Sequence, residues 1–559
     1  MRYIFIILFQ FVCVCNLLQA QAFYYNKTQD IDESINAYED ILVINQDSVL
    51  VSGFLRDSTN KRYNTYCYID PNNGDTISMF KYGRDTMDIY GGLSNNLIIK
   101  NNELFSCGSL YKNSKLYANL LKFSLDGNLL LDTLYNPLGT WSEFESILAL
   151  DDGNFFLIGS KEVSIGNLNA WLVKIDPNGN ILWEQTYGDS NYDGGVSIIK
   201  SGNQFLISAG KTDLSNLKLD IWLIMIDENG SIVWENTYGG SLYDGGNAII
   251  LENGNILILG TKEYDNDHKV AIVSKLDISG NLIWYKEFYK LTVLNAQSSF
   301  GIGVELEDNS IILTGITREN DLITDNPIGL LLKINSQGDS IWSRFYQIRN
   351  NDNYLNDLKS LENGDFLMVG YVFPDSPDNT EDGWIMRTNC LGYFEHPTDS
   401  VVFSGDGLLL NAQNLSAFYE YTSISWGDGA IDNFYEGDLQ TINHSFPLHG
   451  NYSIETTTVA CNDTIRKTID FTANPPNLTE QNLSVFPNPN DGNFQVWLNS
   501  DEVFQIEVFD YNGRLVFTSS EIKLNIGYNL DLTSFDSAVY FLKASSSDNV
   551  FQSRIVITQ

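Results

Sequence analysis

The chain has 559 residues, 43% of them hydrophobic, so it is long enough to bury several separate cores. Its 71 acidic and 33 basic residues give a formal net charge of −38, which repels phosphate backbones and anionic lipid headgroups. We therefore expect no nucleic-acid partner. Carboxylates on such a surface can collect Ca²⁺, although dispersed negative charge also keeps exported proteins soluble.

Residues 1–22 have the features of a cleaved secretory signal peptide. Arg2 precedes an apolar run that is too short and too poorly flanked for a stable membrane span. Ala20 and Ala22 then form an A-x-A cleavage signal, so we expect the mature chain to begin at Phe23. No later run approaches ~18 consecutive apolar residues, and the mature chain is expected to lack a transmembrane segment.

Four cysteines follow the predicted signal peptide: Cys67, Cys107, Cys390 and Cys461. None of them has C-x-x-C metal spacing. In an oxidising compartment four cysteines permit three sets of pairings. The pair Cys390 and Cys461 is attractive because it would pin the end of one domain to the next. The alternative is that all four are buried free thiols.

A repeated unit occupies residues 35–397. Its second predicted strand ends in a glycine in each of seven copies: Gly53, Gly108, Gly159, Gly210, Gly260, Gly315 and Gly370. These glycines recur every 50 to 55 residues, which indicates a repeat architecture. The fourth copy reads as four short strands, GGVSIIK, QFLISAG, DIWLIMIDENG and SIVWENTYG, separated by glycine turns. Seven such units predict an all-β, seven-bladed β-propeller over residues 23–397.

A tryptophan lies four residues after the turn glycine in four of the units: Trp183, Trp234, Trp284 and Trp342. On an outer strand such a ring can cover the neighbouring blade, so we expect packing between blades rather than ligand contact. The first, second and last units lack this tryptophan. The whole pattern resembles a bacterial β-propeller repeat family whose units read roughly G-G-x-x-x-D-x-G, with the best match at 238–260. This resemblance implies the fold and no particular activity.

The D-x-x-G-x-x-x-W segment is also close to the docking motif of quinoprotein propellers. That family implies a quinone cofactor, a bound Ca²⁺ and usually eight blades. This chain has seven units, a turn one residue shorter than the family's, and no adjacent cysteine pair to stack on a quinone. We therefore attribute the similarity to shared blade geometry and expect no cofactor.

Residues 398–474 resemble a PKD-type, Ig-like β-sandwich. The turn Trp426-Gly427-Asp428-Gly429 is a shortened form of the family's W-x-x-G-D-G, and four residues fit its H-x-Y…G-x-Y segment: His444, Phe446, Gly450 and Tyr452. This resemblance implies a spacer or adhesive module.

Residues 475–559 begin with a proline linker and continue with alternating strands, P-N-P, D-x-x-G-R and L-x-x-G-Y segments, and a terminal strand. They closely resemble the type A C-terminal sorting domain of the type IX secretion system of Bacteroidetes. The resemblance implies a small β-sandwich, handling by the type IX machinery, and a secreted or outer-membrane-surface location reached through the periplasm. It also implies removal of this domain, followed by release or attachment to surface polysaccharide.

The sequence presents no catalytic constellation. Four scattered histidines, His268, His396, His444 and His449, give no triad or zinc site, and no G-x-S-x-G, H-E-x-x-H or phosphate loop occurs. One hypothesis concerns the loops that join blades, YGDSNYDGG, YGGSLYDGG and GRDTMDIYGG, which would surround one mouth of the channel. Their candidate ligand-binding residues are Asp88, Tyr90, Tyr192, Asp193, Tyr243 and Asp244. Aromatic faces and carboxylates there would suit a sugar or a cation. The alternative is that the aspartates only cap tight turns.

These observations favour a non-enzymatic binding or adhesion protein with an extracellular glycan or protein ligand. A secreted carbohydrate-active enzyme with its site at the channel mouth is one alternative, and a structural surface-layer component is another. Clustered, desolvated carboxylates would favour the enzyme, and a shallow aromatic rim would favour binding.

Overall fold

A computed structural model describes residues 24–558 except for 30–34, 86, 93–94, 137–140, 190, 214, 216, 266–267, 289–296, 318–325, 349, 374–380, 407, 437–439, 449, 462 and 474–482. Every regular element in this part of the chain is a β-strand, which confirms the all-β prediction. The chain divides into two units, Met1–Glu395 and His396–Gln559, close to the predicted boundary at residue 397. No helix in the described ranges is long and apolar enough to cross a bilayer. The predicted signal peptide and its cleavage site at Ala22 lie outside the described residues.

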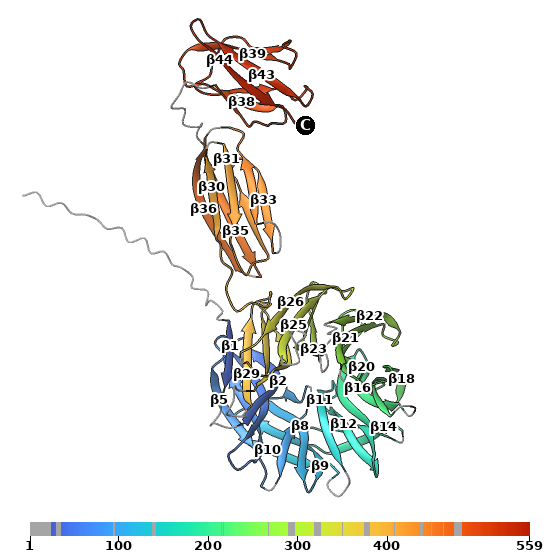
Figure 1. The fold of residues 1–559 in the computed structure, drawn as a ribbon. Coiled ribbons are helices and arrows are strands. Elements are labelled where there is room, and N and C mark those ends of the chain that lie inside the picture. Colours follow the sequence, from blue (N-terminus) through green and yellow to red (C-terminus); the bar gives the residue numbers. More distant parts are fainter. Residues whose placement is uncertain are drawn as a thin grey trace, which may run out of the picture. The chain divides into compact units, whose positions relative to one another are not determined.

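The first unit is a ring of seven antiparallel sheets, and it confirms the seven-bladed propeller (Figure 1). The strands, sheet by sheet, are β2–β5 at Ile35–Asn45, Ser48–Arg56, Arg62–Ile69 and Thr76–Tyr82; β6–β10 at Asp88–Gly91, Leu97–Lys100, Glu103–Lys112, Lys115–Ser124 and Leu129–Leu134; β11–β14 at Ser142–Ala149, Phe155–Ser164, Asn167–Ile175 and Ile181–Tyr187; β15–β18 at Asp193–Ser201, Gln204–Asp213, Lys218–Ile226 and Ile232–Tyr238; β19–β22 at Asp244–Ile250, Ile256–Asp265, His268–Leu276 and Leu282–Phe288; β23–β26 at Ser299–Glu305, Ile311–Thr317, Ile328–Ile334 and Ser340–Tyr346; and β27–β29 at Asn353–Ser360, Phe366–Val372 and Asp382–Thr388.

The last blade takes its fourth strand from the N-terminus of the chain. Strand β1 (Tyr25–Gln29) pairs antiparallel with β29, with Tyr25 opposite Arg387 (Figure 1). The seventh repeat therefore lacks the outer-strand tryptophan because its outer strand precedes the first repeat in the sequence. The pairing of β1 with β29 joins the two ends of the ring.

The repeated glycine is required by a close backbone approach at a β-bulge. A Cβ added at Gly159 would lie 2.0 Å from the carbonyl oxygen of Glu143 on the first strand of its blade. The register shifts between Phe144 and Ser146, beside this contact. A bulge bends the inner strand, and a side chain at the glycine would block that bend.

The outer-strand tryptophans pack between blades, as the sequence predicted. The ring of Trp183 lies against Gly230 in the next blade, where an added Cβ would be 2.9 Å from it. Four residues further along the same strand, the Tyr187 hydroxyl donates to the Gly230 carbonyl at 2.7 Å. Trp234 shows the same relation, with its Nε1–H donating to the Ile278 carbonyl of the following blade at 3.1 Å.

The second unit contains two small β-sandwiches. The first has sheets β30-β31-β34 and β33-β32-β35-β36. Its strands β30–β36 are Val401–Asp406, Leu409–Asn414, Tyr421–Ser425, Ile431–Tyr435, Thr441–Ser445, Gly450–Ala460 and Asp463–Ala473. Its motif residues pack together: the rings of Trp426 and His444 stack at 4.4 Å, and His444 Nε2 lies 2.7 Å from Asp428 Oδ2. The motif therefore builds the core of this sandwich.

The second sandwich has sheets β37-β38-β42 and β40-β39-β43-β44, with β41 beside β39. Its strands β37–β44 are Ser484–Phe486, Asn493–Trp497, Val503–Phe509, Leu515–Thr518, Ile522–Lys523, Tyr528–Asp531, Val539–Ser545 and Val550–Val556. Phe504, Ile506 and Val508 are all buried, which confirms the predicted alternation on β39. Asp510 closes the following turn by accepting the N–H groups of Asn512 and Arg514, both at 2.9 Å.

Candidate functional site

The two Y-D-G-G loops of the propeller each close on a buried aspartate. Asp193 accepts the N–H of Asp189 on Oδ2 at 2.7 Å and the N–H of Thr212 on Oδ1 at 3.0 Å. Asp244 repeats this arrangement with the N–H groups of Gly240 and Glu263. Burial raises the pKa of both carboxyls, although these backbone hydrogen bonds lower it. The contacts of Asp193 support the turn-capping interpretation for that residue.

The residues around each aspartate are also set by the fold. A Cβ added to Gly194 would lie 3.1 Å from the Tyr192 hydroxyl oxygen, and a Cβ added to Gly245 would lie 3.1 Å from the Tyr243 hydroxyl oxygen. A Cβ on Gly195 would be 2.7 Å from a carbonyl oxygen of the preceding blade. The glycines therefore let each tyrosine ring fold back over the chain and let the inner strand pass close to its neighbour.

Three successive blades enclose a cavity of about 210 Å³ beside these loops, which we call the mouth cavity. Its charged and aromatic lining residues are Glu143, Glu145, Tyr192, Asp220, Tyr243 and Asp244. No lysine or arginine occurs among its described lining residues. The cavity therefore combines four carboxyl groups with two aromatic rings.

Partial burial raises the pKa of several groups that line the mouth cavity. Burial, followed by the negative charges of Asp244 and Asp213, raises the pKa of Asp220 to about 6. Its Oδ1 is buried and finds no hydrogen-bond partner within the described part of the chain. Burial likewise raises the pKa of Glu143. Burial, with Glu143 and Glu145 nearby, raises the pKa of Tyr192 to about 12.

The six predicted site residues do not converge on one place. Tyr192, Tyr243 and Asp244 line the mouth cavity, whereas Asp193 does not. Asp88 and Tyr90 belong to a different cluster. Asp88 accepts the N–H of Arg62 at 3.0 Å, and the Arg62 guanidinium lies 4.3 Å from the Tyr90 ring centroid.

The register explains why the third loop differs from the other two. Asp88 pairs opposite Tyr111, three residues beyond the repeated Gly108, whereas Asp193 pairs opposite Lys211, one residue beyond its repeated glycine. The aspartates of GRDTMDIYGG and YGDSNYDGG are thus not equivalent in the blades.

Sequence reasoning missed Glu143, Glu145 and Asp220. The available signal was acidic residues inside strands: glutamates at alternate positions in SEFESILA, and an aspartate that begins an otherwise apolar run in KLDIWLIMI. Carboxylates are uncommon at partly buried positions inside strands, so such residues indicate a special environment.

Two further aspartates, Asp40 and Asp357, link the inner strands of the first and last blades. Asp357 Oδ2 accepts the N–H of Ile41 at 2.8 Å, and Lys359 Nζ lies 2.7 Å from the same oxygen. Asp40 Oδ2 accepts the N–H of Asn96 at 2.8 Å, which extends the link to the second blade. Burial and the neighbouring Asp357 raise the pKa of Asp40 to about 8. These contacts hold three blades together at the channel.

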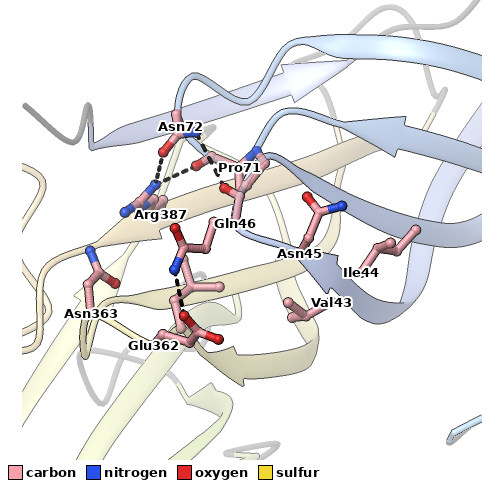
Figure 2. A pocket seen from close by; sticks show the side chains of 10 residues that line it. Val43, Ile44, Asn45, Gln46, Pro71, Asn72, Glu362, Asn363 and Arg387 are labelled. Atoms are coloured by element: carbon pink, nitrogen blue, oxygen red, sulfur yellow. Dashed lines mark hydrogen bonds between the residues drawn. The ribbon is translucent and has the colours of Figure 1, made fainter. Parts of the chain in front are cut away.

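A larger cavity of about 410 Å³ lies between the first and last blades (Figure 2). Arg387 lies in its wall and donates to Pro71 O at 2.9 Å and Asn72 Oδ1 at 3.0 Å. The same guanidinium donates two hydrogen bonds to Asp365 Oδ2, at 3.0 and 2.7 Å. Figure 2 also shows Gln46 of the first blade bonded to Glu362 of the last. These groups bond the two blades to each other, so we assign this cavity to ring closure.

Two of the four cysteines, Cys67 and Cys107, are buried free thiols of the propeller. They do not pair with each other in this structure. Pairing of Cys390 with Cys461 stays a prediction, and so does a Ca²⁺ site on the acidic surface.

Comparison with known proteins identifies the C-terminal sandwich. Residues 484–558 match the model of the secretion system C-terminal sorting domain. The chain is exported by type IX secretion. Its destination is the cell surface or the extracellular space.

The propeller is similar to several solved β-propeller structures at low sequence identity. The propeller domain of the trilobed protease from Pyrococcus furiosus aligns at 10% identity and a TM-score of 0.37, over 64% of this chain and 95% of that one. An ulvan lyase of family PL25, bound to a sulfated disaccharide unit, aligns at 12% identity and a TM-score of 0.43, over 63% and 94%. These similarities concern the fold alone. A search of curated proteins gives no match to the chain.

Proposed function

We propose that the exported chain is a non-enzymatic binding protein whose propeller is the recognition platform and whose mouth cavity is a glycan site. The observation that carries this proposal is the pair of tyrosine rings at the cavity. Tyr192 is 46% exposed and Tyr243 is 38% exposed, although both also line the cavity. Half-exposed aromatic rings beside a few convergent polar groups are typical of ligand sites and offer flat faces to sugar rings.

The remaining segments have supporting roles in this proposal. The signal peptide delivers the chain to the periplasm, and the sorting domain is removed after export from a Bacteroidetes-type cell. The sandwich at 398–474 is a PKD-like spacer, because its motif residues are used to build its own core.

A glycan array probed with the mature chain tests the binding function. A Tyr192→Ala/Tyr243→Ala variant is expected to lose at least ~10-fold in affinity, because each ring supplies contact area that a ligand would otherwise bury. Tyr111→Ala removes a similarly exposed ring, 39% exposed, that does not line the cavity, and is the matched control. Equal binding by the double variant and the control would remove the mouth cavity from the proposal.

One observation favours the alternative of a carbohydrate-active enzyme. A carboxyl with a pKa of about 6, as Asp220 has, is tuned for general acid or base work near neutral pH. Incubating array ligands with the chain and following chain-shortened products tests this alternative. Product that is lost in Asp220→Asn would identify an enzyme and replace the binding proposal.

A further inference from the structure

The larger sheet of the sorting domain carries polar residues on one half of its outer face and apolar residues on the other. Its strands β39, β43 and β44 lie side by side, and every second residue points away from the core (Figure 1). In the polar half, Lys543 Nζ lies 3.0 Å from Glu507 Oε2, and Gln552 pairs opposite Lys543. This half is typical of a sheet face that is exposed to water.

The other half of the face is apolar across four strands. Phe509 pairs opposite Leu515 on one side and Phe541 on the other, so these side chains form one row. Val539 and Val556 pair opposite each other in the next row. Tyr511 follows in the turn after β39 and is 73% exposed. We call these six residues the outer patch: Phe509, Tyr511, Leu515, Val539, Phe541 and Val556.

The outer patch is not part of the core of the sandwich. Tyr540 and Leu542, the neighbours of Phe541 in β43, are buried in the core, whereas Phe541 is 49% exposed on the opposite face. Leu515 is 47% exposed. Two aromatic rings and a leucine with these exposures leave on the order of 300 Å² of apolar surface in water. Contiguous exposed patches of about this size often mark an interaction site.

The rim of the outer patch is basic, although the chain as a whole is acidic. Arg554 pairs opposite Phe541 and is exposed. Arg514 precedes Leu515, and its side chain is 80% exposed, with Nε 3.4 Å from Asp510 Oδ2. Two arginines beside an apolar patch favour a partner that presents carboxylates around an apolar groove. A second copy of the chain is disfavoured, because two chains of net charge −38 repel each other.

The family match indicates which partner this is. Residues 484–558 match a secretion system sorting domain, and such a domain has to be contacted by the system that exports it. We propose that the outer patch docks on a component of the type IX secretion machinery, in an apolar groove whose rim carries carboxylates. The patch is smaller than the ~800 Å² per partner of a stable interface, which suits a contact that the cargo has to leave after transport. This inference concerns export and does not depend on the proposed glycan site.

Fractionation of the native host that expresses the full chain tests the patch. Leu515→Ser/Phe541→Ser is expected to lower the amount at the surface and in the medium by at least ~5-fold, because it removes the centre of the contact. Signal-cleaved chain should accumulate in the periplasm instead. Val503→Ser/Val550→Ser is the matched control, since it removes two apolar side chains, 42% and 58% exposed, from outside the patch. Equal export of the two double variants would overturn the proposal.

Charge variants test the rim while leaving the apolar residues in place. Arg514→Glu/Arg554→Glu is expected to lower export, because it places carboxylates against those of the partner, and Arg514→Lys/Arg554→Lys should restore most of it. Equal export of the glutamate and lysine variants would overturn the carboxylate-rimmed groove. Every purified variant is expected to melt within ~2 °C of the parent, because surface substitutions change stability little.

Photocrosslinking in the native host identifies the partner directly. A full chain with p-benzoylphenylalanine at position 541 is expected to crosslink to a secretion-machinery component that mass spectrometry identifies, and the same group at position 550 should give no such product. A crosslink to a second copy would make the patch a self-association surface, and a crosslink within the same chain would make it an intramolecular contact. Export without any crosslink at position 541 would leave the patch without a partner. Each of these last three results overturns the proposal.

Discussion

The ring of Tyr25 lies against the backbone of Gly74, so that a Cβ added to this glycine would be 2.6 Å from Cε2 of the tyrosine. Trp183 has the same relation to Gly230 further around the ring. The hydrogen bond beside this contact also has a counterpart. Gln29 Nε2 donates to the Gly74 carbonyl at 2.9 Å, as the Tyr187 hydroxyl donates to the Gly230 carbonyl. Strand β1 therefore supplies the interblade contacts of an ordinary outer strand across the closure of the ring.

Replacing Tyr25 is expected to loosen the ring closure specifically. Tyr25→Ala empties a buried site and should lower the free energy of unfolding of the propeller by about 3 kcal/mol, as large-to-small core changes do. Lys27→Ala, on the same strand, removes an exposed ion pair with Asp75 and should cost almost nothing. Urea unfolding followed by tryptophan fluorescence measures both. Equal effects of the two changes would show that β1 contributes only its backbone ladder.

The sequence predicted the propeller because each blade repeats a local requirement. The bulge needs a glycine such as Gly159, and the turn before each outer strand needs another such as Gly179 at φ 80°, so both recur at a fixed period. The closure was not predicted because β1 is a short segment whose partners are distant. Trp384 Nε1–H, for example, donates to Asn26 Oδ1 at 2.6 Å across a separation of 358 residues.

The candidate site was predicted only in part, for a related reason. Tyr192 and Tyr243 lie in repeated loops and were visible as a motif. Glu143 and Asp220 lie on strands of adjacent blades, and the packing of these blades brings both to one cavity. A shift of register places Asp88 in another cluster, which the similarity of the loop sequences concealed.

Breaking the buried ion pair between Arg387 and Asp365 is expected to be costly. Their side chains are 4% and 3% exposed, and Asp365→Leu would leave the guanidinium without its carboxylate. Removal of one partner of a buried pair typically costs about 3–5 kcal/mol, whereas replacement of both costs much less. The double variant Arg387→Met/Asp365→Leu should therefore unfold at a higher urea concentration than Asp365→Leu alone. Arg466→Met, which removes an arginine that is 66% exposed and ion-paired with Glu455, is the surface control. A double variant no more stable than the single one would contradict this account.

The buried pair Asp40 and Asp357 is expected to make the propeller less stable at alkaline pH. The pKa of Asp40 is raised from 3.8 to about 8, so the folded state holds this proton more tightly than the unfolded state does. The stability that this proton contributes is present at low pH and is lost as the pH rises through about 8. Asp40→Asn keeps an acceptor for the Asn96 N–H and should raise the melting temperature at pH 9 by at least ~2 °C, with a smaller gain at pH 6. A gain that is the same at both pH values would exclude titration of Asp40 as its cause.

The cysteines are expected to fall into two chemical classes. Cys67 and Cys107 are buried, and burial raises the pKa of both thiols, so they should resist alkylation in the native protein. We predict that peptide mapping without reductant recovers Cys390 and Cys461 in one linked peptide. Denaturation without reductant should then expose two reactive thiols in the mature chain. Four reactive thiols would support the alternative of free cysteines throughout.

Export of the chain is expected to require the sorting domain. The matched domain spans residues 484–558, and deletion of 477–559 should leave signal-cleaved protein in the periplasm of the native host, because the predicted signal peptide delivers the chain only that far. Grafting 475–559 onto a passive periplasmic reporter should carry the reporter to the surface or the medium.

Substitutions at two neighbouring residues of β39 test whether export requires the folded sorting domain or only its linear sequence. Phe504 is buried and Gln505 is exposed on the opposite face of the strand. Phe504→Asp puts a charge in the core, where an unpaired carboxylate costs several kcal/mol, so the grafted reporter should stay in the periplasm. Gln505→Asp adds the same charge at the surface and should be exported normally. Cell fractionation with an antibody to the reporter measures both. If both variants reach the surface equally, the secretion system reads a linear segment of these residues, because the Asp at position 504 is incompatible with the hydrophobic core around Ile506 and Leu542.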